Sequence, residues 1–306
     1  MKKSLFKILQ NPRRLGLAIL HRYFLWLPDK PYLKLKYWLV MGKKLNLDNP
    51  RSFTEKIQWL KLYDRNPKYT IMVDKLAVKE YVASIIGKDY IIPTLAVWDS
   101  VDEIDLNQLP DKFVLKTTHG GGGKGVVICR DKSNFDFNEA KAILSASLKS
   151  NIYTYYREWP YKDVPRRIIA EQLLENSDEK DIRDYKLFNF DGKVKFLKVD
   201  FNRFIEHRAN YYDPDWNFLN IEEDVCPSDT NIKIDKPNKL SEMITLAESL
   251  SKHIHFIRTD FYFVNNKIYF GEITFYPASG MEHFLPKGSD QEIGKLINLP
   301  IGGVLN

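Results

Sequence analysis

The sequence has few cysteines, no unusual enrichment in glycine or proline, and no long uninterrupted apolar run. Two cysteines among 306 residues, Cys129 and Cys226, exclude a disulfide framework and a cysteine-built zinc site, and they favour a reducing cytoplasm. Fifteen glycines and fifteen prolines exclude collagen-like and low-complexity classes. Because 44% of the residues are hydrophobic and 13% aromatic, the chain can bury a large core, which excludes disorder of the whole chain.

Acidic charge is scarce only at the N-terminus. Residues 1–50 contain 11 Lys and Arg but 2 Asp and Glu, whereas the rest of the chain has a slight excess of acidic residues, so the net charge of +6 comes from this end. A nucleic-acid groove would need basic residues along the body of the protein. The sequence therefore predicts no nucleic-acid partner.

Residues 1–48 form a basic arm in which Leu, Ile, Phe and Trp are interleaved with Lys and Arg. Its apolar run, 15–27, is interrupted by His21 and Arg22 and is shorter than the roughly 20 residues that span a bilayer. No small-residue cleavage site follows it, so no secretory signal is expected. Two interpretations stay open: an amphipathic helix on an anionic membrane surface, or helices that pack on the body. We expect a cytoplasmic protein, peripheral to the inner membrane face in the first case.

The rest of the chain predicts helices and hairpins in alternation. A capping box at Ser52 and Glu55 begins one helix, and a second is expected over 70–86, ended by Gly87. Asp191-Gly192 is a strong two-residue hairpin signal. Further helices are expected at about 137–150 and 238–253, and strands at 113–117, 126–129, 167–174 and 256–274. This pattern is typical of an α+β fold.

Residues 119–125 read His-Gly-Gly-Gly-Gly-Lys-Gly. A dinucleotide-binding turn requires a helix directly afterwards, but strand is expected here, and a Walker A loop requires Ser or Thr after Lys124. The protein-kinase loop is excluded because no H-R-D or D-F-G motif follows. The remaining prediction is a strand–loop–strand hairpin whose backbone N–H groups surround phosphate, with Lys116 and Lys124 adding positive charge. The alternative is a flexible surface hairpin.

The last predicted hairpin contains candidate metal ligands. If its turn takes the three residues 265–267, Asp260 faces Glu272 and Arg258 faces Thr274 on one face. Facing carboxylates repel unless a cation lies between them, and such oxygen ligands suit Mg²⁺. A two-residue turn at 265–266 would place the two acids on opposite faces. The alternative is a structural cluster in which Arg258 neutralises both acids.

In this order, these motifs resemble the ATP-grasp superfamily. The resemblance rests on Lys116, the glycine loop, the stretch 171–174, and the R-x-D and E-x-T motifs of the last hairpin. The segments DYKLFNFDGKVKF, HRANYYDPDWNFL and GEITFYPASG are more narrowly similar to its teichuronopeptide-biosynthesis (TupA-like) branch. The likeness covers about residues 49–290.

The resemblance implies a domain organisation. It consists of the basic amphipathic helical arm, a helical pre-grasp region over 49–110, and an ATP-grasp domain over 111–306. In the grasp domain, two α+β subdomains with antiparallel sheets are expected to grip ATP.

The resemblance also implies the roles of individual residues. Arg258 and Lys186 are the expected catalytic residues, with Lys186 holding phosphate. Mg²⁺ is expected on Asp260, Glu272 and Thr274, where Thr274 stands in place of the superfamily's usual Asn. The backbone of Glu171 and Leu174 is expected to read the adenine edge. The complete set of expected ATP-binding residues is Lys116, His119, Gly120, Gly121, Gly122, Gly123, Lys124, Gly125, Glu171 and Leu174.

The function implied by the resemblance is an ATP- and Mg²⁺-dependent carboxylate–amine ligase that acts through an acyl phosphate. Its expected partners are ATP, a carboxylate-bearing glycan or peptide acceptor and an amine donor, in cell-surface polysaccharide or peptidopolysaccharide biosynthesis. Two alternatives stay open. Asp213-Pro214-Asp215 is a D-x-D sequence that a nucleotide-sugar glycosyltransferase could use, and Thr274 favours a degenerate ATP-grasp binding protein.

Overall fold

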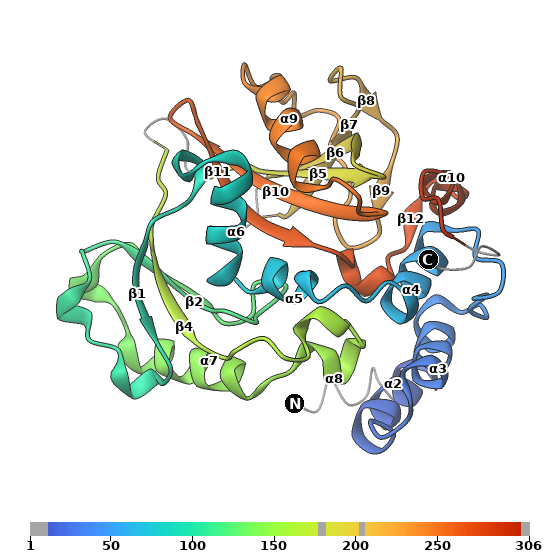
Figure 1. Ribbon diagram of the computed structural model, residues 1–306, viewed down its shortest axis with the longest axis horizontal. Coiled ribbons are helices and arrows are strands. Elements are labelled where there is room, and N and C mark those ends of the chain that lie inside the picture. Colours follow the sequence, from blue (N-terminus) through green and yellow to red (C-terminus); the bar gives the residue numbers. More distant parts are fainter. Residues whose placement is uncertain (1–11, 177–181, 202–205, 301–306) are drawn as a thin grey trace.

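The computed structural model describes residues 12–176, 182–201 and 206–300 (Figure 1). The first eleven residues of the predicted basic arm lie outside these ranges. Two antiparallel sheets form the body of the protein, and Figure 1 shows helix α6 (Ala77–Ile86) between them.

The smaller sheet has four strands in the order β1-β4-β2-β3. All neighbours are antiparallel, and β2 and β3 flank the glycine loop as predicted. Helix α7 (Phe137–Lys149) packs on β2 and β3, and Leu144 joins Phe113 and Leu115 in the core of this sheet. The strands are Thr94–Trp98 (β1), Phe113–Thr117 (β2), Val126–Cys129 (β3) and Ile168–Gln172 (β4).

The larger sheet has six strands in the order β11-β10-β5-β6-β7-β8, again antiparallel throughout. The predicted Asp191-Gly192 turn joins β5 to β6, and both residues have positive φ, of 46° and 79°. A short sheet of β9 and β12 adjoins it. The strands are Asp184–Phe190 (β5), Lys193–Phe201 (β6), Arg208–Tyr212 (β7), Phe218–Leu219 (β8), Glu222–Glu223 (β9), Phe256–Val264 (β10), Lys267–Thr274 (β11) and Phe284–Leu285 (β12).

Alternation along the strands gives the larger sheet two different faces. Asn189 and Thr259 hydrogen-bond each other on the face covered by helix α9, where Ser251 at the end of α9 bonds Asn189. Lys186 and Asp260 alternate with these residues and therefore lie on the opposite face. That face is turned toward α5, α6 and the smaller sheet (Figure 1).

The remaining elements are helices and short 3₁₀ turns. The capping box predicted at Ser52 and Glu55 is present at the start of α4. The other helices are Pro12–Tyr23 (α2), Asp29–Met41 (α3), Phe53–Tyr63 (α4), Lys68–Val73 (α5), Ile152–Tyr156 (α8), Leu240–Leu250 (α9) and Ser289–Lys295 (α10), and the 3₁₀ turns are Lys88–Tyr90, Val101–Glu103, Leu106–Gln108, Lys132–Asn134, Trp159–Tyr161 and Pro277–Gly280.

The single helix predicted over 70–86 is wrong, because α5 and α6 are separate. The Asp74 carboxylate accepts hydrogen bonds from the backbone N–H of Leu76 at 2.8 Å and of Ala77 at 3.3 Å, which caps α6 and stops α5. In the gap, the Lys75 N–H donates to the carbonyl of Thr118 at 3.0 Å. The break therefore attaches the helical region to the start of the glycine loop.

The predicted boundary at residue 110 divides elements that belong to one sheet. Strand β1, in the expected pre-grasp region, pairs along its length with β4. The three-part division stays a prediction, with β1 contributing to the smaller sheet from the N-terminal side of that boundary.

The described part of the basic arm packs on the body. Tyr32 and Lys36 of α3 donate hydrogen bonds to the carbonyl of Tyr155 at 3.0 and 2.6 Å. The Arg157 guanidinium donates to the carbonyl of Leu25 at 2.6 Å and lies over the Tyr32 ring. Within 12–176, 182–201 and 206–300, none of the helices has the length and apolar character needed to cross a membrane.

The burial of Lys36 generates a prediction about pH. Burial first, and the nearby charge of Lys61 second, lower the pKa of Lys36 to about 7. An unfolded chain keeps the ordinary lysine pKa of about 10.4, so between about pH 7 and 10 it binds a proton that the folded chain does not. We expect the free energy of unfolding of the wild type to rise relative to that of Lys36→Met as the pH is raised through this window. Urea unfolding at several pH values measures the difference, and parallel pH profiles would contradict it.

Candidate functional site

The candidate site is built on the β10–β11 hairpin of the larger sheet. Its turn consists of Asn265 and Asn266, with φ of 49° and 57°, since Val264 pairs with Lys267. Positive φ at both central positions is typical of a type I′ turn. Of the two turns that the sequence left open, the two-residue turn is therefore the one present.

A β-bulge nevertheless gives the predicted pairing of the acids. Phe261 pairs with Phe270, whereas Asp260 pairs with Glu272, so Gly271 is the extra residue. A Cβ atom at position 271 would lie 3.1 Å from the Asp260 carbonyl oxygen, which favours glycine there. Asp260 thus faces Glu272, and Arg258 faces Thr274, on one face of the hairpin.

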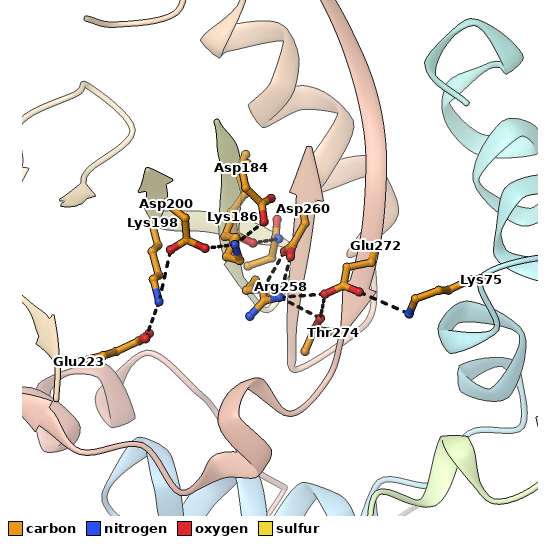
Figure 2. Close-up of polar contacts among 12 residues, drawn as sticks. Lys75, Asp184, Lys186, Lys198, Asp200, Glu223, Arg258, Asp260, Glu272 and Thr274 are labelled. Carbon is orange, nitrogen blue, oxygen red and sulfur yellow. Dashed lines mark hydrogen bonds and ion pairs between the residues drawn. The ribbon is translucent and has the colours of Figure 1, made fainter. Parts of the chain in front are cut away.

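Arg258 holds the polar groups of the hairpin together (Figure 2). Its Nε and Nη2 donate to the two carboxylate oxygens of Asp260 at 2.7 and 2.6 Å. Nη2 also donates to Glu272 Oε1 and to Thr274 Oγ1, at 3.2 Å each. Arg258 thus neutralises both acids, as in the structural cluster that the sequence left open. The carboxylates keep lone pairs that could bind a further cation.

The two facing acids have opposite pKa shifts. Burial raises the pKa of Asp260, with the Arg258 charge opposing it. Burial acts the same way on Glu272, but the charges of Lys75, Arg258 and Lys186 outweigh it and lower the pKa of Glu272 to about 2. Glu272 is therefore ionised at neutral pH.

Two lysines lie beside Asp260 on the neighbouring strands of the sheet. Lys186 of β5 pairs in register with Asp260, and Lys198 of β6 pairs with Lys186. Lys186 Nζ lies 2.5 Å from Asp184 and also bonds Asp200, so its ammonium group is enclosed by two carboxylates. Although burial opposes them, these carboxylates raise the pKa of Lys186, which keeps it charged. Its expected contact with phosphate stays a prediction.

The glycine loop is a tight hairpin that is anchored at its base. The Thr117 N–H donates to the Gly125 carbonyl at 3.0 Å, and Gly122, Gly123 and Gly125 have φ of 60°, 75° and 73°. Gly122, Gly123 and Lys124 are exposed, whereas Gly125 is buried. Positive φ explains why three of these positions are glycine.

Lys75 connects the glycine loop to the β10–β11 hairpin. Its Nζ donates to the Gly120 carbonyl at 2.6 Å and lies 3.6 Å from Glu272 Oε2. Figure 2 shows Lys75 approaching Glu272 from the side opposite Lys186. Two motifs some 150 positions apart in the sequence therefore lie within reach of one ammonium group.

Lys116 of β2 is held by a carboxylate. Its Nζ lies 2.5 Å from Glu171 Oε2, and Lys79 Nζ lies 2.7 Å from Glu171 Oε1. Although burial opposes them, the charges of Lys116 and Lys79 lower the pKa of Glu171. Leu174 follows β4 and is half-buried. The expected contact of the Glu171 and Leu174 backbone with adenine stays a prediction.

His119 turns toward helix α7. Its ring is buried and its Nε2 lies 3.1 Å from the carbonyl oxygen of Ser147 near the end of α7. Burial lowers the pKa of His119, so the ring is neutral at pH 7. The expected contact of His119 with phosphate or substrate stays a prediction.

Sequence reasoning missed three lysines of the site. Lys75 and Lys79 lie on the segment where one continuous helix was expected, and Lys198 lies on a strand whose alternation gave no reason to select it. Their roles depend on Glu171, Glu272 and the other carboxylates that the fold brings close. A lysine beside Asp74, at a helix break, was the one local signal available.

The family profile described as TupA-like ATPgrasp matches residues 55–298, which include both sheets, the glycine loop and the β10–β11 hairpin. The chain belongs to the TupA-like ATP-grasp family. Its α+β architecture of two antiparallel sheets is the ATP-grasp fold that the sequence predicted. Among curated proteins, none matches this TupA-like chain.

Solved structures similar to this TupA-like protein include ligases and synthetases. N5-carboxyaminoimidazole synthetase from Staphylococcus aureus is 17% identical, with a TM-score of 0.39, over 67% of this chain and 44% of that chain. D-alanine–D-alanine ligase from Helicobacter pylori is 14% identical, with a TM-score of 0.41, over 80% and 69%. The Bacillus anthracis ligase complexed with ATP is 15% identical, with a TM-score of 0.38, over 67% and 53%. The chain thus spans about half the length of two of these three proteins.

The glycine loop generates a prediction about stability. A Cβ atom at Gly125 would lie 2.2 Å from Ser147 Oγ and 2.6 Å from Thr117 Oγ1, whereas at Gly123 it would meet no atom within 4 Å. Both positions have positive φ, so each Ala variant loses about 1–2 kcal/mol from backbone strain. We expect Gly125→Ala to lower the free energy of unfolding by more than Gly123→Ala does. Urea unfolding compares the two, and equal losses would refute the anchored loop.

Proposed function

We propose that this TupA-like ATP-grasp protein is an ATP- and Mg²⁺-dependent ligase that joins a carboxylate to an amine through an acyl phosphate. Its setting would be the biosynthesis of a cell-surface polysaccharide or peptidopolysaccharide, with a carboxylate-bearing glycan or peptide as acceptor. The observation that carries the proposal is the Asp260–Glu272 pair, which lies on the same sheet face as Lys186 and is joined through Lys75 to the glycine loop.

The hairpin residues fit a magnesium ion. Asp260, Glu272 and Thr274 present hard oxygen donors on one face, and the low pKa of Glu272 keeps its carboxylate charged. When bound there, Mg²⁺ would neutralise charge on the phosphoryl oxygens of ATP. The Thr274 hydroxyl accepts a hydrogen bond from Arg258 and donates one to Glu272.

The chain's own residues have consistent roles in this chemistry. The backbone N–H groups of Gly122 and Gly123, which are exposed residues of the glycine loop, bind the ATP phosphates, and Lys116 and Lys75 add positive charge. The acceptor carboxylate takes the γ-phosphoryl group and ADP leaves. The amine nitrogen then attacks the acyl carbon and phosphate leaves, while the Arg258 guanidinium stabilises the oxyanion.

The glycosyltransferase alternative has little support from its D-x-D sequence. Asp213 Oδ1 accepts hydrogen bonds from the backbone N–H of Asp215 at 3.0 Å and of Asn217 at 2.8 Å, and Oδ2 accepts one from the Asn217 amide. The Asp213 carboxylate thus stabilises the turn between β7 and β8. For the binding-protein alternative, Thr274 is the feature in its favour, and its contacts with Arg258 and Glu272 place it with the other expected ligands.

The proposed nucleotide site is tested with a non-hydrolysable ATP analogue. We expect Glu272→Gln to weaken Mg²⁺-dependent binding about tenfold or more, because a charged ligand of the ion is lost, and Lys116→Met to weaken it similarly with or without Mg²⁺. Isothermal titration measures both variants.

Glu292→Gln is the matched control, since Glu292 is an exposed residue of α10 whose partner is Lys295. Unchanged nucleotide binding in Glu272→Gln and Lys116→Met would contradict the ligase site. Binding of nucleotide sugars alone would favour the transferase.

We also propose that the arm binds an anionic membrane surface while α3 stays packed on the body. Trp26 and Tyr23, at the turn between α2 and α3, are 74% and 67% exposed. The basic residues close to them in sequence, Arg22, Lys30 and Lys34, are exposed, and Arg13 and Arg14 are exposed at the other end of α2. Aromatic side chains among cations are typical of an interfacial segment. A peripheral location would bring the site close to lipid-linked glycans.

Vesicle co-sedimentation tests the arm. We expect the Tyr23→Ser, Trp26→Ser double variant to bind vesicles that contain anionic lipid at least several-fold more weakly than the wild type, because it removes the apolar contact. Added salt should also weaken wild-type binding. Tyr63→Ser, at an exposed tyrosine of α4, is the matched control. Equal binding of neutral and anionic vesicles would overturn this proposal.

A further inference from the structure

A small cavity adjoins the β10–β11 hairpin on the side of Arg258. Its volume is about 60 Å³. This volume holds about two water molecules, or one ammonium group with a short stem. Its walls combine four charged residues with aromatic rings: Lys198, Glu223, Arg258, Glu282, Phe188 and Phe284.

Glu282 is the one acid of this cavity without an ion-pair partner. It is 8% exposed, and its carboxylate accepts a hydrogen bond from the backbone N–H of the adjacent His283 at 3.2 Å. Across the described parts of the chain, no cationic group lies within 4.0 Å of it. A carboxylate buried to this extent requires a cation or a proton.

The two cationic side chains that line the cavity with Glu282 form ion pairs with other acids. Lys198 Nζ bonds Glu223, which also accepts a hydrogen bond from the Tyr211 hydroxyl at 2.5 Å. Arg258 uses Nε and Nη2 for Asp260 and Glu272. Glu282 is therefore the carboxylate of this cavity that lacks a cation, whereas Lys198 and Arg258 are paired with other acids.

The walls of the cavity are rigidly held. β9 pairs with β12, and the Asp224 N–H donates to the His283 carbonyl at 3.0 Å, which fixes the backbone beside Glu282. The cavity wall at Ala278 has a φ of 44°. Gln58 holds this turn through the next two carbonyls, at 2.9 and 2.8 Å. Such preorganisation is typical of binding sites.

We propose that this cavity binds the amine substrate of the ligase as a primary ammonium group, with Glu282 as its partner. The inference rests on the proposed function and adds the amine subsite to it. Arg258 lines the cavity and also contacts Asp260 and Glu272, so an amine held by Glu282 lies in a cavity that shares Arg258 with the two acids.

Glu282 also prepares the amine for attack. One ammonium proton passes to its carboxylate, giving a carboxylic acid and a neutral amine. The nitrogen lone pair forms the C–N bond, the C–O bond to phosphate breaks, and the second proton leaves with hydrogen phosphate. Burial first, and the charge of Glu223 second, raise the pKa of Glu282 to about 7, which suits a proton acceptor near neutral pH.

Methylammonium is the probe, because it carries the proposed group and fits the cavity. Saturation-transfer NMR on the full chain compares it with tetramethylammonium, which has the same charge but no N–H donor. We expect saturable binding of methylammonium alone, weakened about tenfold in Glu282→Gln and unchanged in Glu292→Gln. Binding of the ATP analogue, measured on the same samples, should be equal in all three proteins and reports that the variant is folded.

Absent methylammonium binding, or equal binding in the wild type and Glu282→Gln, would overturn the amine subsite. Displacement of methylammonium by potassium at matching concentrations would also overturn it, in favour of a monovalent metal ion. If the wild type binds the ATP analogue but the probe result is negative, the subsite alone is wrong. Absent nucleotide binding in the wild type would instead count against the proposed ligase.

Discussion

The candidate site depends on compensation of negative charge that is clustered on one face of a sheet. Asp260 and Glu272 face each other across the hairpin, and Asp184 and Asp200 follow on the neighbouring strands. Such an arrangement is unstable unless cations lie between the acids. Arg258 and Lys186 provide that charge from within the sheet, and Lys75 provides it from the helical region. The charged groups therefore fix both the geometry of the site and the approach of α5 and α6 to the sheet.

The break between α5 and α6 connects this charge network to the glycine loop. Asp74 ends one helix and caps the next, which leaves the backbone and side chain of Lys75 directed at Thr118, Gly120 and Glu272. A continuous helix would have used the Lys75 N–H internally. The loop can carry consecutive glycines because its base is fixed by this attachment and by the buried Thr117–Ser147 contact.

Patterns of adjacent residues predicted most of the fold. The features that could not be predicted depend on contacts between residues that are distant in the sequence. The capping box, the Asp191-Gly192 turn and the strands around the glycine loop were predictable because each depends on a few adjacent residues. The facing of Asp260 and Glu272 was predicted only for a three-residue turn, and the two-residue turn that is present gives it because of the bulge. Lys75 and Lys79 could not be identified as site residues from the sequence, because the carboxylates that they contact, Glu272 and Glu171, are distant in the sequence. The apolar periodicity of 70–86 predicts one helix, but the Asp74 side chain accepts backbone hydrogen bonds that end α5 and begin α6. The periodicity contains no information about these side-chain hydrogen bonds.

The bulge at Gly271 determines whether facing residues of the hairpin are separated by an odd or an even number of positions. Partners across a regular hairpin with a two-residue turn are separated by an odd number of positions, as Val264 and Lys267 are. Asp260 and Glu272 are separated by an even number, so they can pair only if the turn gains a residue or one strand does. Two residues at an even spacing that must face each other across a two-residue turn therefore require a bulge, and here Gly271 occupies it.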